Sequence, residues 1–151
     1  MQIAIDSSVL VGLLNPNDVW HAQALDLRDA LLAERMTVVY FDCVVAEAIS
    51  TAARRLHEKG RGAEVQDLLK QLATHAPRDL ITWILPDVPR LYPEVLELIR
   101  TSSGKLNFND ALIATACRER SIADLASFDA DFDRVTWLKR IDTATDITTG
   151  S

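Results

Sequence analysis

The stretch that decides the fold reads Ile3-Ala4-Ile5-Asp6-Ser7-Ser8-Val9-Leu10. Its short apolar run, which ends on a carboxylate, predicts a buried strand over residues 2–6. A helix is expected over residues 7–14, and it ends at the turn cluster Asn-Pro-Asn-Asp of residues 15–18. The chain therefore begins with a strand that runs directly into a helix, and Asp6 stands at their junction.

The same alternation of strands and helices continues along the rest of the chain. β-Branched and aromatic runs predict strands, and apolar residues at helical spacing predict helices. Pro86 and Pro89 are expected to break the chain before the fourth long helix. This order is typical of an α/β protein with a mainly parallel central sheet, in which functional residues gather at the carboxyl ends of the strands. We expect strands over residues 37–41, 80–85, 122–127 and 135–141, and helices over residues 21–34, 42–59, 63–75, 92–101 and 107–120.

The length of 151 residues suits one domain with a sizeable core. We expect a single domain over residues 1–147 and a flexible tail over residues 148–151. No apolar run is long enough to span a membrane, and the N-terminus lacks the features of a signal peptide, so a cytoplasmic location is expected. Cys43 and Cys117 lack the spacing of a disulfide framework or a zinc site.

The charge balance limits how the protein can bind nucleic acid. The net charge is -6 and the pI is about 5.0, which is a poor electrostatic match for a polyanion. A protein of this charge that acts on RNA needs a local basic patch, a metal ion, or both. One local basic group comes after the helical segment that carries Glu47. It consists of Arg54, Arg55, Lys59 and Arg61.

Acidic residues are the side chains most suited to chemistry in this chain. Mg²⁺ and Mn²⁺ prefer carboxylate oxygens, and carboxylates that meet at one point repel each other unless a cation neutralises them. Metal ions held in this way can activate water for phosphodiester cleavage without a side-chain nucleophile. The candidates are Asp6, Glu47, Asp110, Asp129 and Asp131.

Each of these acids also has a purely structural interpretation. Asp6 could cap the helix that follows it, and Glu47 could point from its helix into solvent. Asp110 could favour the dipole of a helix capped just before it, and on its own this interpretation is the better one. Asp129 and Asp131 could cap a short turn. Position along the chain does not decide between these alternatives.

Taken together, four segments resemble the PIN-domain family, and within it the ribonuclease toxins of VapC type. They occur in the family's order and extend over almost the whole chain. The resemblance implies a three-layer α/β/α sandwich and an RNA phosphodiesterase that depends on Mg²⁺ or Mn²⁺. The segments are residues 3–10, Val45-Ala46-Glu47-Ala48-Ile49-Ser50, Leu106-Asn107-Phe108-Asn109-Asp110-Ala111-Leu112-Ile113-Ala114, and Ala126-Ser127-Phe128-Asp129-Ala130-Asp131-Phe132.

The resemblance also implies roles for individual residues. Asp6, Glu47 and Asp110 match the three main metal-binding acids, and Asp129 is the choice for the fourth, with Asp131 as its competitor. Ser8, Asn109, Ser127 and Arg54 are candidates for binding the substrate or orienting the metal ligands. The hydroxyls could equally be local turn caps, Asn109 a surface residue, and the cation Arg54 part of a solvated helix end.

Partners follow from the same resemblance. Toxins of this kind form homodimers, and a cognate antitoxin protein silences them, so the leading hypothesis is the toxin of a type II toxin–antitoxin pair. The alternatives are an RNA-processing nuclease of the same fold and a catalytically silent binding module. A haloacid-dehalogenase-type phosphatase is disfavoured because Ser8 stands where its second aspartate belongs. The tryptophans Trp20, Trp83 and Trp137 are expected to pack in or near the core rather than to stack on bases.

Overall fold

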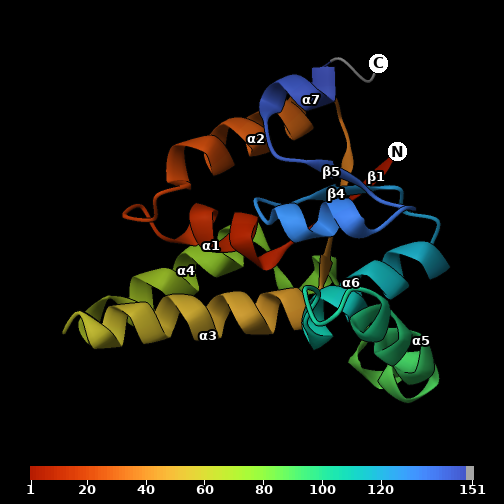
Figure 1. The fold of residues 1–151 in the computed structure, drawn as a ribbon. Coiled ribbons are helices and arrows are strands. Elements are labelled where there is room, and N and C mark those ends of the chain that lie inside the picture. Colours follow the sequence, from red (N-terminus) through yellow and green to blue (C-terminus); the bar gives the residue numbers. More distant parts are fainter. Residues whose placement is uncertain (149–151) are drawn as a thin grey trace.

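The computed structural model describes residues 1–148, and in this part of the chain five parallel strands form a central sheet (Figure 1). The strand order is β3-β2-β1-β4-β5, and all four pairings are parallel. This confirms the predicted α/β class and its parallel sheet. The strands are β1 (Gln2–Ile5), β2 (Thr37–Phe41), β3 (Ile81–Thr82), β4 (Asp124–Ala126) and β5 (Lys139–Ile141).

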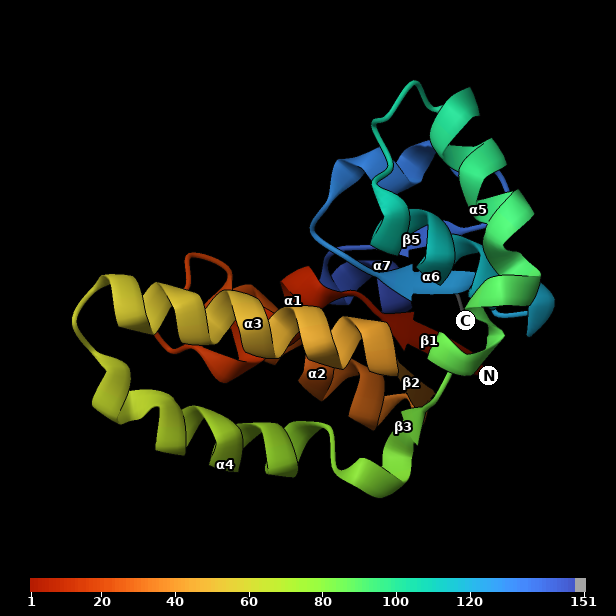
Figure 2. The ribbon, with the colours of Figure 1, turned by 90° about the horizontal axis from the view of Figure 1, so that it is seen from below.

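Helices cover both faces of the sheet and make the predicted α/β/α sandwich. Helices α1 to α4 lie together on one side, and α5 and α6 pack against each other on the other side (Figure 2). Within residues 1–148, no helix combines the length and apolar character that crossing a bilayer requires. The helices are α1 (Ser7–Leu14), α2 (His21–Ala33), α3 (Asp42–Glu58), α4 (Val65–His75), α5 (Val88–Thr101), α6 (Phe108–Glu119) and α7 (Ala144–Thr148), with short 3-10 turns η1 (Gly62–Glu64), η2 (Arg78–Leu80), η3 (Leu85–Asp87) and η4 (Ala130–Arg134).

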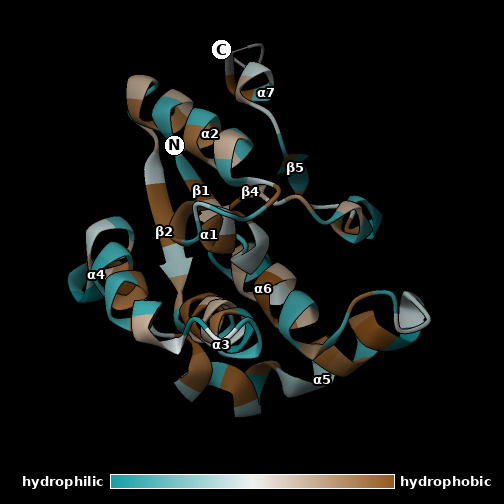
Figure 3. Ribbon diagram, turned by 90° about the vertical axis from the view of Figure 1, so that its left-hand side faces the viewer, coloured by the Kyte–Doolittle hydropathy of each residue, from teal (hydrophilic) through white to brown (hydrophobic). Residues whose placement is uncertain are grey.

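Strand β1 lies at the centre of the sheet and of the hydrophobic core. Ile3, Ala4 and Ile5 are fully buried, as expected for a parallel strand that is covered on both faces. The hydropathy colouring in Figure 3 shows the apolar sides of the surrounding helices. From β1 the chain crosses to β2 on one side, and it later returns to β4 on the other. The carboxyl ends of β1 and β4 therefore flank a topological switch point, where ligands bind in open α/β sheets.

Several boundaries differ from those that the sequence predicts. The strand expected over residues 80–85 is only two residues long, and the strand expected over 135–141 begins at Lys139. The break predicted at Pro89 was wrong, because α5 starts at Val88 and tolerates a proline in its first turn, where no intrahelical N–H bond is needed. Helix α7, which packs on α2, was not predicted.

The predicted domain boundary at residue 147 falls within α7. The remainder of the predicted tail, residues 149–151, lies outside the described residues, so the tail stays a prediction.

Candidate active site

Asp6 lies at the carboxyl end of β1, directly at the switch point. Its side chain is 3% exposed, and one carboxylate oxygen, Oδ2, accepts hydrogen bonds from Ser8 Oγ at 2.9 Å and Ser127 Oγ at 2.7 Å. Burial raises the pKa of Asp6, the bonds from the two hydroxyls lower it, and the nearby charge of Asp129 raises it further. The cap suggested as an alternative is not formed, because the Asp6 side chain makes no cap bond to α1.

The two serines connect Asp6 to the segment that follows β4. Ser8 Oγ accepts the backbone N–H of Phe128 at 3.1 Å, and Ser127 Oγ accepts the backbone N–H of Asp129 at 3.0 Å. Each hydroxyl therefore donates to the carboxylate and accepts from the loop, so the loop and the carboxylate hold one another in place. Ser127 is completely buried, so water does not compete for its hydrogen bonds.

Glu47 points from α3 toward this carboxylate instead of into solvent. Its atom Oε2 is buried and has no hydrogen-bond partner among the described residues. Burial and the charge of Asp6 raise the pKa of Glu47, while bonds from the side chains of Ser7 and Asn109 lower it. A buried acceptor without a donor is costly, so its presence indicates a group that the chain itself does not supply.

Asp110 caps its helix, as one of the two interpretations from the sequence holds, and it also lines the acidic cleft. Its Oδ2 accepts the backbone N–H of Asn107 at 3.1 Å, and its own N–H donates to Asn107 Oδ1 at 2.9 Å, which makes a reciprocal capping box at the start of α6. Burial raises its pKa to about 7, and the charges of Asp6, Asp129 and Glu47 contribute to the rise. The helix cap thus lies within the electrostatic reach of the other three acids.

The structure separates the two competing aspartates of the acidic loop. Asp129 lines the same cleft as Asp6 and Asp110, and its charge acts on the pKa of both. Asp131 does not line this cleft, and its carboxylate lies 3.7 Å from the guanidinium of Arg134. Asp129 also accepts the backbone N–H of Asp131 at 2.9 Å, so it caps the η4 turn as well. The geometry therefore favours Asp129 as the fourth acid.

These side chains line a cleft of about 230 Å³. Its rim carries Asp18 and Arg55, joined by a 2.9 Å bond between Arg55 Nη1 and Asp18 Oδ1. Arg54 does not line the cleft and lies instead near Glu58 on the exposed side of α3. The cleft residues are Asp6, Ser7, Ser8, Val11, Asp18, Glu47, Thr51, Arg55, Asn107, Asp110 and Asp129.

Of the cleft residues that sequence reasoning missed, which include Thr51, Asp18 is the one that pairs with Arg55. It stands in a turn cluster with ordinary turn composition, and its partner Arg55 is 37 positions away. Arg55 itself belongs to the basic group after residue 42, but charge alone did not distinguish it from Arg54. Only the helical phase of α3, which turns Glu47, Thr51 and Arg55 to one side at four-residue spacing, could have indicated it.

The donor set suits a hard divalent cation. Carboxylate oxygens from four separate segments meet at one cleft, where neighbouring acids help to raise the pKa values of Asp6, Glu47 and Asp110, and Glu47 Oε2 is unpartnered among the described residues. Among residues 1–148, however, no three His, Cys, Asp or Glu side chains close into a compact coordination group. The capping box accounts for part of this, because it turns one oxygen of Asp110 toward the Asn107 N–H.

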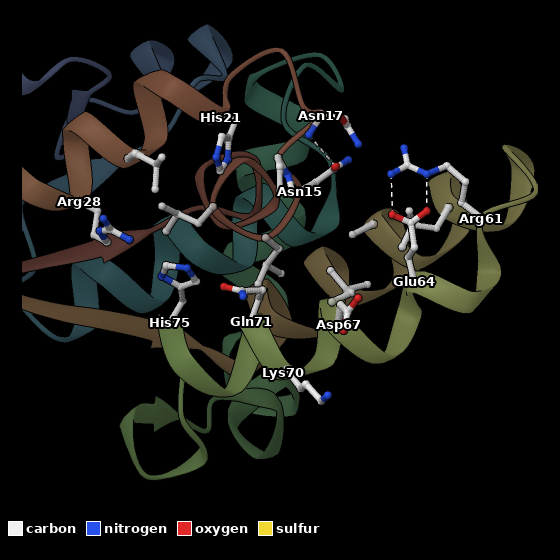
Figure 4. Close-up of a pocket in the computed structure, with 17 residues that line it drawn as sticks. Asn15, Asn17, His21, Arg28, Arg61, Glu64, Asp67, Lys70, Gln71 and His75 are labelled. Atoms are coloured by element: carbon white, nitrogen blue, oxygen red, sulfur yellow. Dashed lines mark hydrogen bonds and ion pairs between the residues drawn. The ribbon is translucent and has the colours of Figure 1, made fainter.

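A larger hollow of about 620 Å³ lies between α2 and α4, away from the acidic cluster (Figure 4). His21 Nδ1 bonds the backbone oxygen of Gly12 there at 2.7 Å, and Glu64 pairs with Arg61. Burial, together with the charges of Arg28 and His21, lowers the pKa of His75. None of the five predicted acids lines this hollow, so its size alone does not make it the candidate site.

Fold and cleft together define a class of protein: a parallel α/β sandwich with a carboxylate cluster at the switch point of its sheet. The PIN domain family model matches residues 3–138, so the chain belongs to the PIN-domain family, as its resemblance implied.

Among solved structures, the chain is similar to the crystal structure of Mycobacterium tuberculosis VapC20 (Rv2549c), a sarcin-ricin loop cleaving toxin, with a TM-score of 0.67. The two sequences are 22% identical, and the similarity covers 89% of this chain and 95% of VapC20, so the likeness shows a shared fold. No curated protein sequence matches the chain.

Proposed function

We propose that this chain is a metal-dependent endoribonuclease that hydrolyses RNA phosphodiester bonds, and that it is the toxin of a type II toxin–antitoxin pair. The observation that carries the proposal is the convergence of Asp6, Glu47, Asp110 and Asp129 on one cleft, with Glu47 Oε2 buried and unpartnered. Membership of the PIN-domain family and the fold shared with VapC20, a sarcin-ricin loop cleaving toxin, support it.

The four acids are the residues that would hold Mg²⁺ or Mn²⁺. Such an ion supplies an activated water and neutralises charge on the phosphodiester. Ser8 and Ser127 orient Asp6, because each donates to the same oxygen of its carboxylate and is itself fixed by a backbone N–H. Outer partners of this kind set the direction in which a ligand points.

Substrate binding falls to the polar residues around the acids. Arg55 is the cation on the rim of the cleft, so we assign to it the contact with a backbone phosphate next to the cleaved bond. Asn109 lowers the pKa of Glu47, so we assign to it the positioning of that carboxylate. Arg54 is exposed on the outer side of α3, so we assign to it a contact with a more distant part of a long RNA.

A homodimer is supported by an apolar surface over η2, η3, α5 and the start of α6. Tyr92 and Phe108 contact each other there, with ring centroids 6.4 Å apart. Exposed side chains of this size on adjoining elements are typical of protein interfaces. The antitoxin would be a protein made with the toxin in the cytoplasm. The exposed residues of this surface are Leu80, Trp83, Leu85, Tyr92, Leu96 and Phe108.

The direct test is cleavage of a mixed pool of structured RNAs by purified protein in Mg²⁺ or Mn²⁺. We expect cleavage that EDTA abolishes and that the variant Asp6→Asn does not show. No cleavage by folded protein freed of any partner, with any metal, would contradict the nuclease and favour a silent binding module. Growth arrest on expression, relieved by the neighbouring gene, distinguishes a toxin from a processing enzyme.

A further inference from the structure

An aromatic pair lies beside the acidic cleft. The rings of Trp20 and Phe128 stack with centroids 4.9 Å apart and planes 18° from parallel. Trp20 stands just before α2, and Phe128 follows β4, so the pair joins two distant segments of the chain. Trp20 packs near the core, as expected, because Phe128 lies against it, yet 42% of Trp20 remains exposed.

Backbone hydrogen bonds connect both residues of the pair to residues that line the cleft. Phe128 stands between Ser127 and Asp129, and its backbone N–H donates to Ser8 Oγ at 3.1 Å. The backbone N–H of Trp20 donates to Asp18 Oδ2 at 3.0 Å, and the other oxygen of Asp18 accepts from Arg55 at 2.9 Å. The stacked pair does not line the cleft itself, but its backbone is bonded to Ser8 and Asp18, which do, and Asp18 pairs with the arginine that we assign to a phosphate.

The exposed ring is not needed to hold the local backbone. The carbonyl of Trp20 accepts the N–H of Ala24 at 2.8 Å. The same carbonyl packs closely on Gly12, where an added Cβ would lie 3.4 Å from its oxygen. These contacts belong to the main chain, so any residue at position 20 retains them. The indole itself contacts the ring of Phe128, and much of its surface stays open to solvent.

We infer that Trp20, supported by Phe128, is a stacking platform for an unpaired nucleobase of the RNA next to the phosphate in the cleft. The inference rests on the proposed ribonuclease activity and assigns a base-binding residue to it. A base in a duplex already stacks on its neighbours, so it cannot lie on the indole. Every base has a flat aromatic face, so the platform tolerates sequence but requires a base.

The first experiment is a cycle between the tryptophan and the base. The cleavage site of a short RNA is mapped, and RNAs are made with one abasic ribose within three nucleotides of it. With intact RNA we expect Trp20→Ala to reduce kcat/KM about tenfold. Trp20→Phe should retain most of the rate. Val19→Ala, which changes an exposed residue of the same turn without removing a ring, should behave as the parent.

The cycle gives opposite results for a stacking role and a structural role. For one of the abasic RNAs the parent should lose about the same factor as Trp20→Ala does, and that variant should lose nothing further. If Trp20→Ala keeps the parent's rate on intact RNA, or if its loss adds to the loss from every abasic ribose, the inference is overturned.

A binding measurement separates this inference from the proposed cleavage. Tryptophan fluorescence of the Asp6→Asn protein is followed on titration with octaadenylate and with an abasic ribose-phosphate octamer. Quenching by octaadenylate alone, and its loss in Asp6→Asn/Trp20→Phe, supports the platform even if the parent cleaves no RNA. Equal quenching by both oligomers, or none, overturns it.

Discussion

The carboxyl ends of β1 and β2 carry the same residue in two different roles. Asp6 follows β1 and Asp42 follows β2, and both side chains are buried, with 3% and 4% exposed. The carboxylate of Asp42 accepts three backbone N–H groups, from Cys43 at 2.9 Å, Ile84 at 3.0 Å and Leu85 at 2.9 Å. Asp6 accepts side-chain hydrogen bonds from two serine hydroxyls, and four other carboxylates line the same cleft.

The chain path accounts for this difference. After β3, the segment that leads into η3 crosses the end of β2 and brings its N–H groups to Asp42. Within residues 1–148 no segment is seen to cross the end of β1 in this way, because the chain leaves toward β2 on one side and returns to β4 on the other. A buried aspartate at a strand end is thus a structural anchor where the backbone covers it, and a candidate ligand where the backbone leaves it open.

The largest effect expected from this comparison is on catalysis by Asp6→Asn. We expect cleavage to fall roughly a thousandfold, equivalent to about 4 kcal/mol in the barrier, because a ligand of the proposed metal is lost. The metal-free protein should be as stable as the parent or more so, since one charge leaves a cluster of like charges. Initial cleavage rates and urea unfolding in EDTA measure both. A large loss of stability would indicate that Asp6, like Asp42, is a structural anchor.

The matched variant Asp42→Asn should show the opposite pattern. One oxygen that accepts a backbone N–H becomes an NH₂ group, so a buried donor faces a donor, and we expect about 3 kcal/mol less unfolding free energy. The cleavage rate per folded molecule should stay close to that of the parent. Urea unfolding and active-fraction-corrected rates check this. A stable but inactive variant would contradict the assignment of Asp42 as an anchor.

Ser8→Ala and Ser127→Ala sharpen the comparison on the side of Asp6. Each removes one donor to Oδ2 and one acceptor for the loop, so we expect about tenfold weaker Mn²⁺ binding and a similar loss of rate. Calorimetric titration with Mn²⁺ and cleavage assays measure these effects. Thr115→Ser, a change in a buried hydroxyl that bonds only within α6, is the control. Unchanged Mn²⁺ affinity in both variants would remove the serines from the site.

The comparison also predicts a pH dependence of stability. The pKa of Asp110 is about 7 in the folded chain and 3.8 as its ordinary value. The folded state therefore holds a proton that the unfolded chain has released. This contribution is present in full below about pH 4 and is lost as the pH rises through about 7. In EDTA, the parent should lose stability relative to Asp110→Asn over this range, and Mn²⁺ should reverse the loss most strongly above pH 7.

Urea unfolding of the two proteins between pH 5 and 8 tests this expectation. Asp110→Asn keeps an oxygen for the capping bond to Asn107, so the helix start is preserved. Parallel pH profiles of parent and variant in EDTA would contradict the expectation and leave Asp110 with its capping role alone.

The central strand of the fold could be predicted from the local sequence pattern, whereas the extent of the edge strands could not. The run Ile3-Ala4-Ile5 is apolar throughout because β1 is covered on both faces, and such a run is visible in the sequence. The segment 80–85 looked similar, yet only two of its residues pair, because Ile84 and Leu85 donate instead to Asp42. A bond to a side chain 42 positions away leaves no local signature.

The candidate site shows the same division. The acids and serines could be named from the ordered segments, but their roles remained open because each had a plausible local use. Which of Asp129 and Asp131 lines the cleft, which of Arg54 and Arg55 does so, and how exposed Trp20 is all depend on the direction in which side chains point after packing.

By itself, the sequence determined the alternation of strands and helices, the parallel sheet, and the family of the chain, because periodicity and motif order are properties of neighbouring residues. Only the tertiary structure decided which buried aspartate is satisfied and which is left open. That difference depends on where distant backbone N–H groups lie. A buried carboxylate is stabilised where such donors reach it, and it stays available to a ligand where they do not.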